Sequence, residues 1–384
     1  MQRSFKFRIY PDRKQEARMN QSLESCYELY NVLLQMKIDK YKDEKIILSQ
    51  FDLNKIATEL DVPIHSQVKQ NISKRINDAF QHFFRRVKEK KGKAGFPRFK
   101  SSNRYKSITF PQSGFKINHK KICLSKIGNI DIVLHREIKG KIKTLTIKRC
   151  ADRWYAIFSC EGIIIDKIKP KERKVGIDVG LENFATLSNG EKIENPRFLK
   201  KSERKLTRLQ RRLSKKKKGS ENRRKARLKV ARQHEKIFNQ RNDFLHNQTA
   251  KIVRRFKIIA VEKLNINGMI KNRYLAKSIS DVGWNRFIQM LSYKVENTGG
   301  KVKLVNPKYT SQICSHCGYK QKMPLSKRTF NCSNCGFKIN RDLNASRNIL
   351  NTSGQGEIND SGQNVRPLET KANLKEGVSY RENA

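Results

Sequence analysis

Residues 174–190, KVGIDVGLENFATLSNG, decide the fold of the second half of the chain. The apolar run around Val175 and Ile177 predicts a buried strand, Gly180 permits a tight turn, and FATL predicts a second strand that closes a hairpin. The stretch therefore starts a new α/β unit. It also places Asp178 in an apolar strand, where an unpaired carboxylate is costly.

Composition narrows the possible partners. The 384 residues are enough for two or three domains, and 85 Lys and Arg against 35 Asp and Glu give a net charge of +50. This excess predicts a polyanionic partner, and nucleic acid is the leading candidate. An anionic membrane surface is the rival, but the sequence has no run of eighteen apolar residues, and MQRSFKFRIYPDR lacks the apolar stretch of a signal peptide. We therefore expect a cytoplasmic protein without a membrane partner.

The first half of the chain predicts a strand, a helical stretch and a set of short strands. Residues 1–10 alternate as a strand, and the residues up to about 90 follow a helical pattern with Leu23, Tyr27, Tyr30 and Leu34 in the core. Glycine and proline in GKAGFPRFK, residues 92–100, mark a boundary. From about 106 to 165, runs such as SITF, INHKKICL and RWYAIFSC predict a small antiparallel barrel or sheet, into which the N-terminal strand can pair.

The second half continues with basic helices and buried strands. Residues 200–232 contain 17 Lys or Arg and two acids, in two predicted helices separated by residues 215–220. Residues 257–269 predict a buried strand that ends in Glu262, residues 284–300 a helix stopped by Gly299 and Gly300, and residues 301–307 another strand. The polar sequence from Thr352 onward predicts a disordered tail.

Two CxxC pairs predict a zinc site. Cys314 and Cys317 in CSHCG are followed, after fourteen residues, by Cys332 and Cys335 in CSNCG. Four thiolates at this spacing match a closed tetrahedral structural site, and each following glycine permits the turn that directs both sulfurs to one Zn²⁺ ion. His316 lies inside the first pair and is expected to be a spectator. The other four cysteines are scattered, so we expect no disulfide framework.

Three acids raise the question of a second, catalytic metal site. Asp178 and Glu262 lie at the ends of buried strands, and Asp342 starts the apparent helix DLNASRNIL. Carboxylates from separate strands and a helix can converge on two Mg²⁺ ions that hold a phosphodiester for attack by water. Each acid also has an ordinary explanation: Asp178 as a turn former, Glu262 as an ion-pair partner of Lys263 or of a neighbouring residue, and Asp342 as a helix cap. Spacing alone leaves these alternatives open.

Several longer motifs occur in one order along the chain. They are GIDVGLENFATLSNG, IIAVEKLNINGM, WNRFIQMLSYKVENTGGKV, NPKYTSQICSHCG, CSNCG and NRDLNASRNIL, with RIYPDRKQ and GFPRFK upstream. In this order they resemble the TnpB proteins of bacterial and archaeal insertion sequences over most of residues 1–350. The sequence beyond residue 352 carries no motif of this kind.

The resemblance implies an α/β multidomain protein whose nuclease domain has an RNase H-like, RuvC-type fold. It suggests that residues 1–10 and 96–170 form a small β-barrel wedge domain and that residues 11–95 form a helical recognition lobe. Residues 171–350 would form the nuclease domain, with the zinc knuckle inserted at 308–338, and residues 351–384 the tail. It also assigns the catalytic, Mg²⁺-binding role to Asp178, Glu262 and Asp342, all of which are present.

The resemblance further implies RNA-guided cleavage of double-stranded DNA next to a short flanking motif, as in type V CRISPR effectors. Two Mg²⁺ ions would serve catalysis and one Zn²⁺ ion would be structural. The partners would be a guide RNA from the transposon end, with one protein per RNA, and target DNA in the nucleoid of a prokaryotic cell. The alternatives are a guided regulator or transposition accessory protein that does not cut, and a DDE-type transposase that joins strands.

The basic excess fits this function, because base pairing would recognise sequence while Lys and Arg hold the nucleic-acid backbones. The candidate contacts are Arg98, Lys100, Arg204, Lys205, Arg208, Arg211, Arg212, Arg223 and Arg224. A solvated helix face is the ordinary explanation for residues 200–232. Phe99, between the first two candidates, is expected either to stack on RNA or to pack in the protein.

Overall fold

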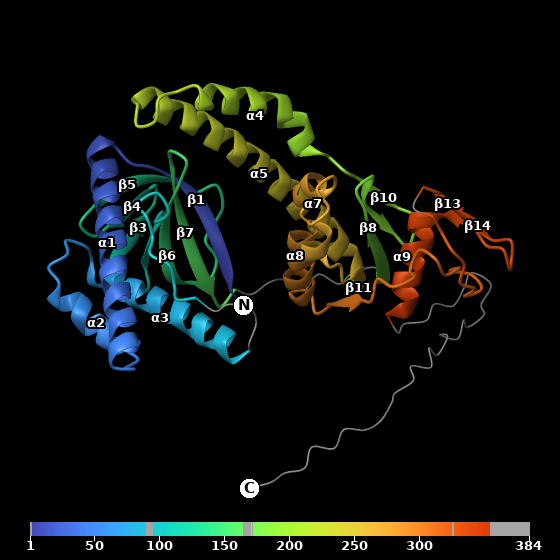
Figure 1. The fold of residues 1–384 in the computed structure, drawn as a ribbon, viewed down its shortest axis with the longest axis horizontal. Helices are drawn as coiled ribbons and strands as arrows, with labels where there is room; N and C mark the ends of the chain where they lie inside the picture. Colours follow the sequence, from blue (N-terminus) through green and yellow to red (C-terminus); the bar gives the residue numbers. More distant parts are fainter. Residues whose placement is uncertain (1, 90–94, 164–169, 171, 325, 354–384) are drawn as a thin grey trace, which may run out of the picture. The chain divides into compact units, whose positions relative to one another are not determined.

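The structure is a computed structural model, and it describes residues 2–89, 95–163, 170, 172–324 and 326–353. The chain divides into two compact units, Met1–Ile165 and Asp166–Ala384 (Figure 1). Residues 354–384, which make up most of the predicted disordered tail, lie outside the described residues. Thr352, where that tail was predicted to start, is instead the last residue of helix α9 (Arg341–Thr352).

A seven-stranded antiparallel sheet organises the first unit, in the order β2-β6-β7-β1-β5-β4-β3. Its strands are β1 (Arg3–Tyr10), β2 (Ser107–Phe110), β3 (Phe115–Asn118), β4 (Lys121–Leu124), β5 (Gly128–Val133), β6 (Lys141–Cys150) and β7 (Arg153–Glu161). β1 pairs with β7 on one side and with β5 on the other, which confirms that the N-terminal strand joins this sheet. INHKKICL forms part of a hairpin, β3 and β4, rather than one strand, because the chain turns at His119, whose φ is 45°.

Three helices share the core of this sheet: α1 (Arg13–Asp43), α2 (Gln50–Glu59) and α3 (Ser66–Lys88). Asp12 caps α1, because its side chain accepts from the N–H of Gln15 while the Gln15 side chain accepts from the N–H of Asp12. Three of the four aromatic and leucine residues predicted for the core of α1 are buried, and the fourth, Tyr27, is half-buried. Helices and strands form one apolar cluster, so the predicted recognition lobe and wedge domain stabilise each other.

A five-stranded mixed sheet organises the second unit, in the order β10-β9-β8-β11-β12. Its strands are β8 (Glu172–Val179), β9 (Asn183–Leu187), β10 (Lys192–Glu194), β11 (Phe256–Glu262) and β12 (Lys301–Val305). β8 and β9 form the predicted antiparallel hairpin, with the N–H of Gly180 donating to the carbonyl of Phe184 at its turn. β11 runs parallel to both β8 and β12. Parallel neighbours need long crossover connections, and helices provide them here.

Helices cover both faces of this second sheet. α5 (Glu221–Arg255) and α8 (Trp284–Glu296) pack on one face, and α9 packs on the other (Figure 1). α4 (Phe198–Ser214) pairs with α5, which confirms the predicted break between two basic helices. The short helices α6 (Ile266–Met269) and α7 (Ala276–Val282) were not predicted, because so few residues do not show a helical period. None of the described helices has the apolar length that crossing a membrane requires.

The hairpin of α4 and α5 is held at both ends. At its base, Asp281 of α7 accepts from the N–H of Leu199 in the first turn of α4 (3.1 Å) and from the guanidinium of Arg241 in α5 (2.5 Å). At its tip, the guanidinium of Arg223 donates to the carbonyl oxygen of Lys216 at 2.6 Å. The hairpin is therefore a defined projection of the second unit.

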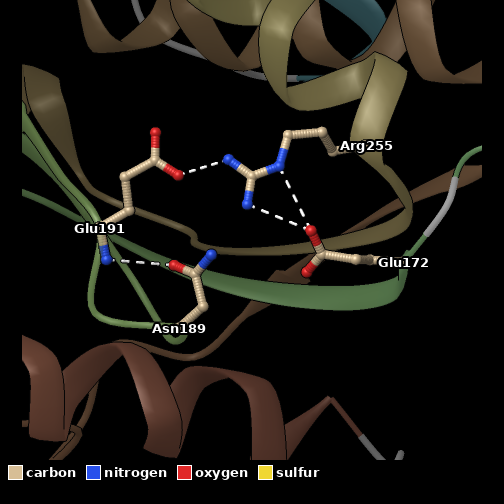
Figure 2. A network of polar contacts seen from close by, with 4 residues as sticks. All are labelled: Glu172, Asn189, Glu191 and Arg255. Atoms are coloured by element: carbon tan, nitrogen blue, oxygen red, sulfur yellow. Dashed lines mark hydrogen bonds and ion pairs between the residues drawn. The ribbon is translucent and has the colours of Figure 1, made fainter.

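Arg255, the last residue of α5, joins the start of β8 to the turn between β9 and β10 (Figure 2). Its guanidinium contacts Glu172 at 3.1 Å and Glu191 at 2.5 Å, and the N–H of Glu191 donates to the side-chain oxygen of Asn189. The network thus links the end of α5 to two strands of the sheet, although partly exposed ion pairs add little to the free energy of folding.

Side chains alternate across β8 and β11, and this alternation separates the core from the candidate site. The valine and isoleucine side chains of β8 join the apolar cluster under α5 and α8. Gly176 and Asp178 therefore face the side on which α9 packs. On β11, Ala260 packs with Ile349 of α9, and Glu262 lies two residues further along the same face.

Gly176 is the point at which α9 crosses β8. A Cβ atom there would lie 2.1 Å from the carbonyl oxygen of Ser346 and 2.9 Å from the Cβ atom of Leu350. Only a residue without a side chain permits backbone and helix to approach so closely. The start of α9, with Asp342, is consequently held near the end of β8.

We expect Gly176→Ala to destabilise the second unit by about 1–3 kcal/mol, because the added methyl group must push α9 away from β8. Thermal and urea denaturation of the purified protein measure this change. Gly95→Ala is the matched control, since nothing lies within 4 Å of its Cβ position. Equal stability of the two variants would contradict the close crossing.

Candidate active site and zinc site

Asp178 and Glu262 lie side by side at the carboxyl ends of β8 and β11. Ile177 pairs with Val261 in parallel register, so the next residue on each strand is one of the two acids. Neighbouring strands are about 4.8 Å apart, and both side chains point to the face of α9. Asp178 belongs to β8 itself and the turn comes later, at Gly180, so the turn-former explanation does not hold.

Asp342 reaches the same edge of the sheet from α9. Asn340 is the cap of this helix, because its side-chain oxygen accepts from the N–H groups of Asp342 (3.1 Å) and Leu343 (3.2 Å). Asp342 is therefore not the cap. Its carboxylate is 19% exposed and lies 3.6 Å from the guanidinium of Arg341.

The three carboxylates are close enough to interact electrostatically. The pKa of Asp178 is raised well above its ordinary value, first by burial and then by the negative charges of Glu262 and Asp342, while Arg341 acts in the opposite direction. Burial also raises the pKa of Glu262, against a hydrogen bond from Thr310. Acids that repel one another in a partly buried site are typical of functional positions, and a bound cation offsets their repulsion.

This donor set fits hard divalent cations, which prefer oxygen ligands. Among the described residues, the four cysteines are the one group of three or more His, Cys, Asp or Glu whose candidate ligand atoms all lie within 4.8 Å of one another. The three carboxylates are thus more widely spread than the ligands of one closed site.

Three further residues at the site were missed by the sequence analysis. The hydroxyl of Thr310 donates to Oε1 of Glu262 at 2.5 Å. Asn344 and Asn348 on α9 are buried and bond to the backbone of residues 310–315. These residues lie in NPKYTSQ and DLNASRNIL, but residue type alone does not tell which polar side chains become buried.

The four CxxC cysteines form one cluster. Sγ of Cys314 lies 3.8 Å from Sγ of Cys335, and Sγ of Cys317 lies 3.6 Å from Sγ of Cys332. A tetrahedral ion with Zn–S bonds of about 2.3 Å needs sulfur atoms about 3.8 Å apart. Burial raises the pKa of Cys314 to about 12, so this thiol needs a cation in order to ionise at neutral pH. The cluster can therefore hold one zinc ion.

Backbone geometry supports the same cluster. Gly318 and Gly336 have φ values of 77° and 68°, and the N–H of each donates to the carbonyl of the first cysteine in its pair, which confirms the predicted turns. The second pair lies between β13 (Thr329–Asn331) and β14 (Lys338–Asn340), which form an antiparallel hairpin, and β14 leads directly into α9. The ring of His316 stacks on Phe337 outside the cysteine group, which fits the spectator role predicted for it.

The candidate nucleic-acid contacts differ in exposure. Seven are exposed: Arg98 in the first unit, Arg204, Lys205, Arg208, Arg211 and Arg212 on α4, and Arg224 on α5. Three of the nine have partners within the protein. Lys100 is half-buried with Nζ 3.9 Å from the ring centroid of Tyr30, Arg223 bonds to the turn after α4, and Arg224 pairs with Glu221. Phe99 is 49% exposed, so it is not a core residue.

A groove between α4 and α5 concentrates positive charge. Its basic lining residues come from both helices and from the turn that joins them: Arg212, Lys215, Lys216, Lys225 and Lys229. A second depression along α4 is lined by Arg204, Arg208, Arg211, Arg212 and Lys215, with Glu203 as the one acid among its lining residues. Concave surfaces with an excess of one sign of charge raise the local concentration of the opposite ion. The projection therefore suits a polyanion.

Three family profiles match different parts of the chain. The profile described as "Probable transposase" (OrfB_IS605) matches residues 160–273, and that described as "Cas12f1-like, TNB domain" matches residues 284–349. Between them they contain the three acids and the four clustered cysteines. A third, described as "Helix-turn-helix domain", matches residues 1–45, which here form strand β1 and helix α1.

Curated relatives extend over nearly the whole chain. A protein of Streptomyces pristinaespiralis named "Putative RNA-guided DNA endonuclease" is 32% identical over 368 residues, which are 91% of this chain and 89% of that protein. "Putative RNA-guided DNA endonuclease InsQ" of Escherichia coli strain K12 is 33% identical over 375 residues, 90% and 91% of the two chains. The chain therefore belongs to the TnpB family, as its motifs suggested.

Solved structures show the same architecture at low sequence identity. The chain matches the protein in a Cas12f1–sgRNA–target DNA complex with a TM-score of 0.58 and 14% identity, covering 91% of this chain and 98% of that one. It matches the mini-RNA-guided endonuclease CRISPR-Cas_phi3 with a TM-score of 0.52 and 11% identity, covering 92% of both chains. The protein thus has the mixed α/β fold of Cas12 effectors.

We expect about one zinc ion per chain in the wild type and less in Cys332→Ser, which removes one ligand. The melting temperature should also fall, because the knuckle has few apolar side chains apart from its ligands. Metal analysis and thermal denaturation measure the two effects. Cys150→Ser, in the first unit and outside the cluster, is the control. If zinc content and melting were the same in both variants, these thiols would not be zinc ligands.

Asp178→Asn should raise the melting temperature of the metal-free protein at pH 7. The folded pKa of Asp178 lies above its unfolded value, so the folded state binds the proton more tightly, and stability falls as pH rises from about 4 through the raised pKa. The neutral amide of Asn removes this pH-dependent loss. We expect the free energy of unfolding to rise by about 1 kcal/mol at pH 7 and the difference to disappear below about pH 4. Thermal denaturation in EDTA across this pH range tests it, with Asp61→Asn as an exposed control. A destabilised Asp178→Asn variant at pH 7 would refute the electrostatic argument.

Proposed function

We propose that this protein is an RNA-guided endonuclease that cleaves double-stranded DNA next to a short flanking motif. The observation that carries the proposal is the convergence of Asp178, Glu262 and Asp342 at one edge of the mixed sheet, where burial and the charges of the other two carboxylates raise the pKa of Asp178. Membership of the TnpB family supports it, because two relatives that match along almost their full length are named for this activity.

The second unit is proposed to be an RNase H-like, RuvC-type nuclease domain with the zinc knuckle inserted before α9. The order of its sheet supports this assignment, since an antiparallel hairpin is followed by parallel strands and the acids lie at adjacent strand ends. In the first unit, the antiparallel sheet would be the wedge domain and helices α1 to α3 the recognition lobe.

The catalytic centre is proposed to use Asp178, Glu262 and Asp342 as oxygen ligands for two Mg²⁺ ions. When bound, these ions supply an activated water and stabilise the charge that develops on the phosphodiester. The carboxylates contribute by fixing where the ions bind, since two come from adjacent strands and the third from a helix packed on them. The apolar sheet beneath the carboxylates would strengthen their electrostatic attraction for cations, because fewer water molecules screen the charges there.

The zinc ion is proposed to be structural. Four thiolates complete its tetrahedral shell and leave no position for a reacting water. The knuckle's own apolar interior is small, with Phe330 as its largest buried side chain. Metal binding would therefore fix the loop that leads from the second CxxC pair into α9.

The proposed partners are a guide RNA derived from the transposon end, with one protein per RNA, and double-stranded DNA. The exposed arginines and lysines of α4 support this, because they can hold phosphate backbones without reading sequence. Sequence recognition would come from base pairing with the guide. The proposed place of action is the prokaryotic cytoplasm, at the nucleoid.

The test is cleavage of a plasmid library with randomised flanking sequences by the copurified ribonucleoprotein, with and without EDTA. We expect linear products with one enriched flanking motif in Mg²⁺ and none in EDTA. Asp178→Ala should lower the cleavage rate by about a hundredfold to ten-thousandfold, because a metal ligand is worth several kcal/mol of transition-state stabilisation.

Other outcomes separate the alternatives. Guide-directed DNA binding without cleavage would favour a regulator or accessory protein. Strand transfer with transposon ends, in the absence of guide-directed cuts, would favour a DDE-type transposase. The absence of any RNA in the purified protein would contradict guided activity of either kind.

A further inference from the structure

Strand pairing fixes the backbone of Glu262, but its carboxylate needs a hydrogen-bond donor to hold it in one orientation. Its strand is held on both sides, by β8 and β12, and the pairing with β12 continues past it, since the N–H of Lys263 donates to the carbonyl of Val305 at 2.8 Å. The Glu262 side chain is only 7% exposed, so water does not readily supply that partner.

Thr310 supplies the partner. Its hydroxyl lies 2.5 Å from Oε1 of Glu262 and 3.4 Å from the carbonyl of Pro307, and it has one proton to donate. The shorter contact, to a carboxylate, is the stronger one. Thr310 is itself 7% exposed, so this bond is shielded from solvent. It directs one carboxylate oxygen to the hydroxyl and leaves the other oxygen, Oε2, for a different ligand.

The backbone before Thr310 adopts a conformation that supports this bond. Tyr309 has a φ of 66°, in the left-handed region that bulky side chains rarely occupy. Its carbonyl accepts from the N–H groups of Gln312 (2.9 Å) and Ile313 (3.1 Å), which closes a turn around Thr310. An unusual backbone angle beside a metal site is a recognised sign of functional constraint.

The helix that carries Asp342 holds this turn in place. Nδ2 of Asn348 donates to the carbonyls of Thr310 (2.8 Å) and Ile313 (2.6 Å). One helical turn earlier, Asn344 donates to the carbonyl of Ile313 (2.7 Å) and accepts from the N–H of Ser315 (2.9 Å). The next residue after Ile313 is the first cysteine of the zinc cluster. Residues 310–315 therefore connect Glu262, α9 and the zinc knuckle.

We propose that Thr310 is a positioning residue that orients the carboxylate of Glu262 for a divalent cation, and that Asn348 holds Thr310 in place for this task. The inference rests on the proposed function, in which Glu262 is a metal ligand. It extends that function, because it makes α9 position two of the three acids: Asp342 directly and Glu262 through Thr310. Outer-sphere hydrogen bonds of this kind typically change metal affinity or activity by about 10–100-fold.

The decisive measurement is Mn²⁺ binding to the purified protein, followed by electron paramagnetic resonance of the free ion. Thr310→Val keeps the shape of the side chain and removes the hydroxyl, so we expect Mn²⁺ affinity to fall about 10–100-fold. Thr310→Ser keeps the hydroxyl and should restore most of the affinity. Thr298→Val is the matched control, because the hydroxyl of Thr298 donates to the carbonyl of Val295 in its own turn, away from the three acids.

Cleavage gives a second readout. In the ribonucleoprotein, Thr310→Val should shift the Mg²⁺ concentration for half-maximal cleavage upward by a similar factor, while guide RNA binding and DNA binding remain at the level of Thr298→Val. Asn348→Ala should weaken Mn²⁺ binding as well. The double variant should bind Mn²⁺ about as weakly as Thr310→Val alone, because both substitutions interrupt one chain of contacts.

The outcomes distinguish the two proposals. If Glu262→Gln binds Mn²⁺ as tightly as the wild type, Glu262 is not a ligand and the proposed function itself fails. If Glu262→Gln binds weakly but Thr310→Val binds like Thr298→Val, the positioning role fails alone. A loss of melting temperature in Thr310→Val that Thr310→Ser does not restore would mean that Thr310 acts only in folding, which also overturns the inference.

Discussion

Three carboxylates of like charge lie close together at one edge of an apolar sheet, and the second unit must be stable enough to hold them there. Asp178 and Glu262 are neighbours because their strands are parallel and in register, and the pKa of Asp178 is raised by burial and by the other two carboxylates. Folding works against this repulsion, so packing elsewhere must supply the stability. The close crossing of α9 over Gly176 and the apolar cluster under α5 and α8 provide it.

The zinc knuckle and the acidic site form one connected structure. The segment after β12 passes Glu262 at Thr310, enters the first CxxC pair, and returns through β13 and β14 to the helix that carries Asp342. Two buried asparagines of that helix bond back to the same segment. The cysteine cluster is thus connected, through this segment and α9, to two of the three acids. A metal ion in a closed shell of four thiolates can still take no part in the chemistry.

Charge is distributed unevenly between shielded and exposed positions. The basic side chains of α4 are exposed and line concave surfaces, whereas Lys100 and Arg223 are half-buried and have partners within the protein. Asp281 and Arg241 fix the base of the basic hairpin. A net charge of +50 repels itself in a compact protein, and a polyanionic partner would relieve that repulsion. High salt should therefore weaken association far more than it affects the fold.

The sequence by itself determined the secondary structure of most segments, the cysteine cluster, the break between the basic helices and the family, because these depend on local periodicity, short spacing and long motifs. It named the three acids but left their convergence open. Strand register, the approach of α9 at Gly176 and the burial of Thr310, Asn344 and Asn348 were decided only by the tertiary structure. The physical reason is that each depends on contacts between residues tens to hundreds of positions apart, and residue type alone does not determine which polar side chain such contacts enclose.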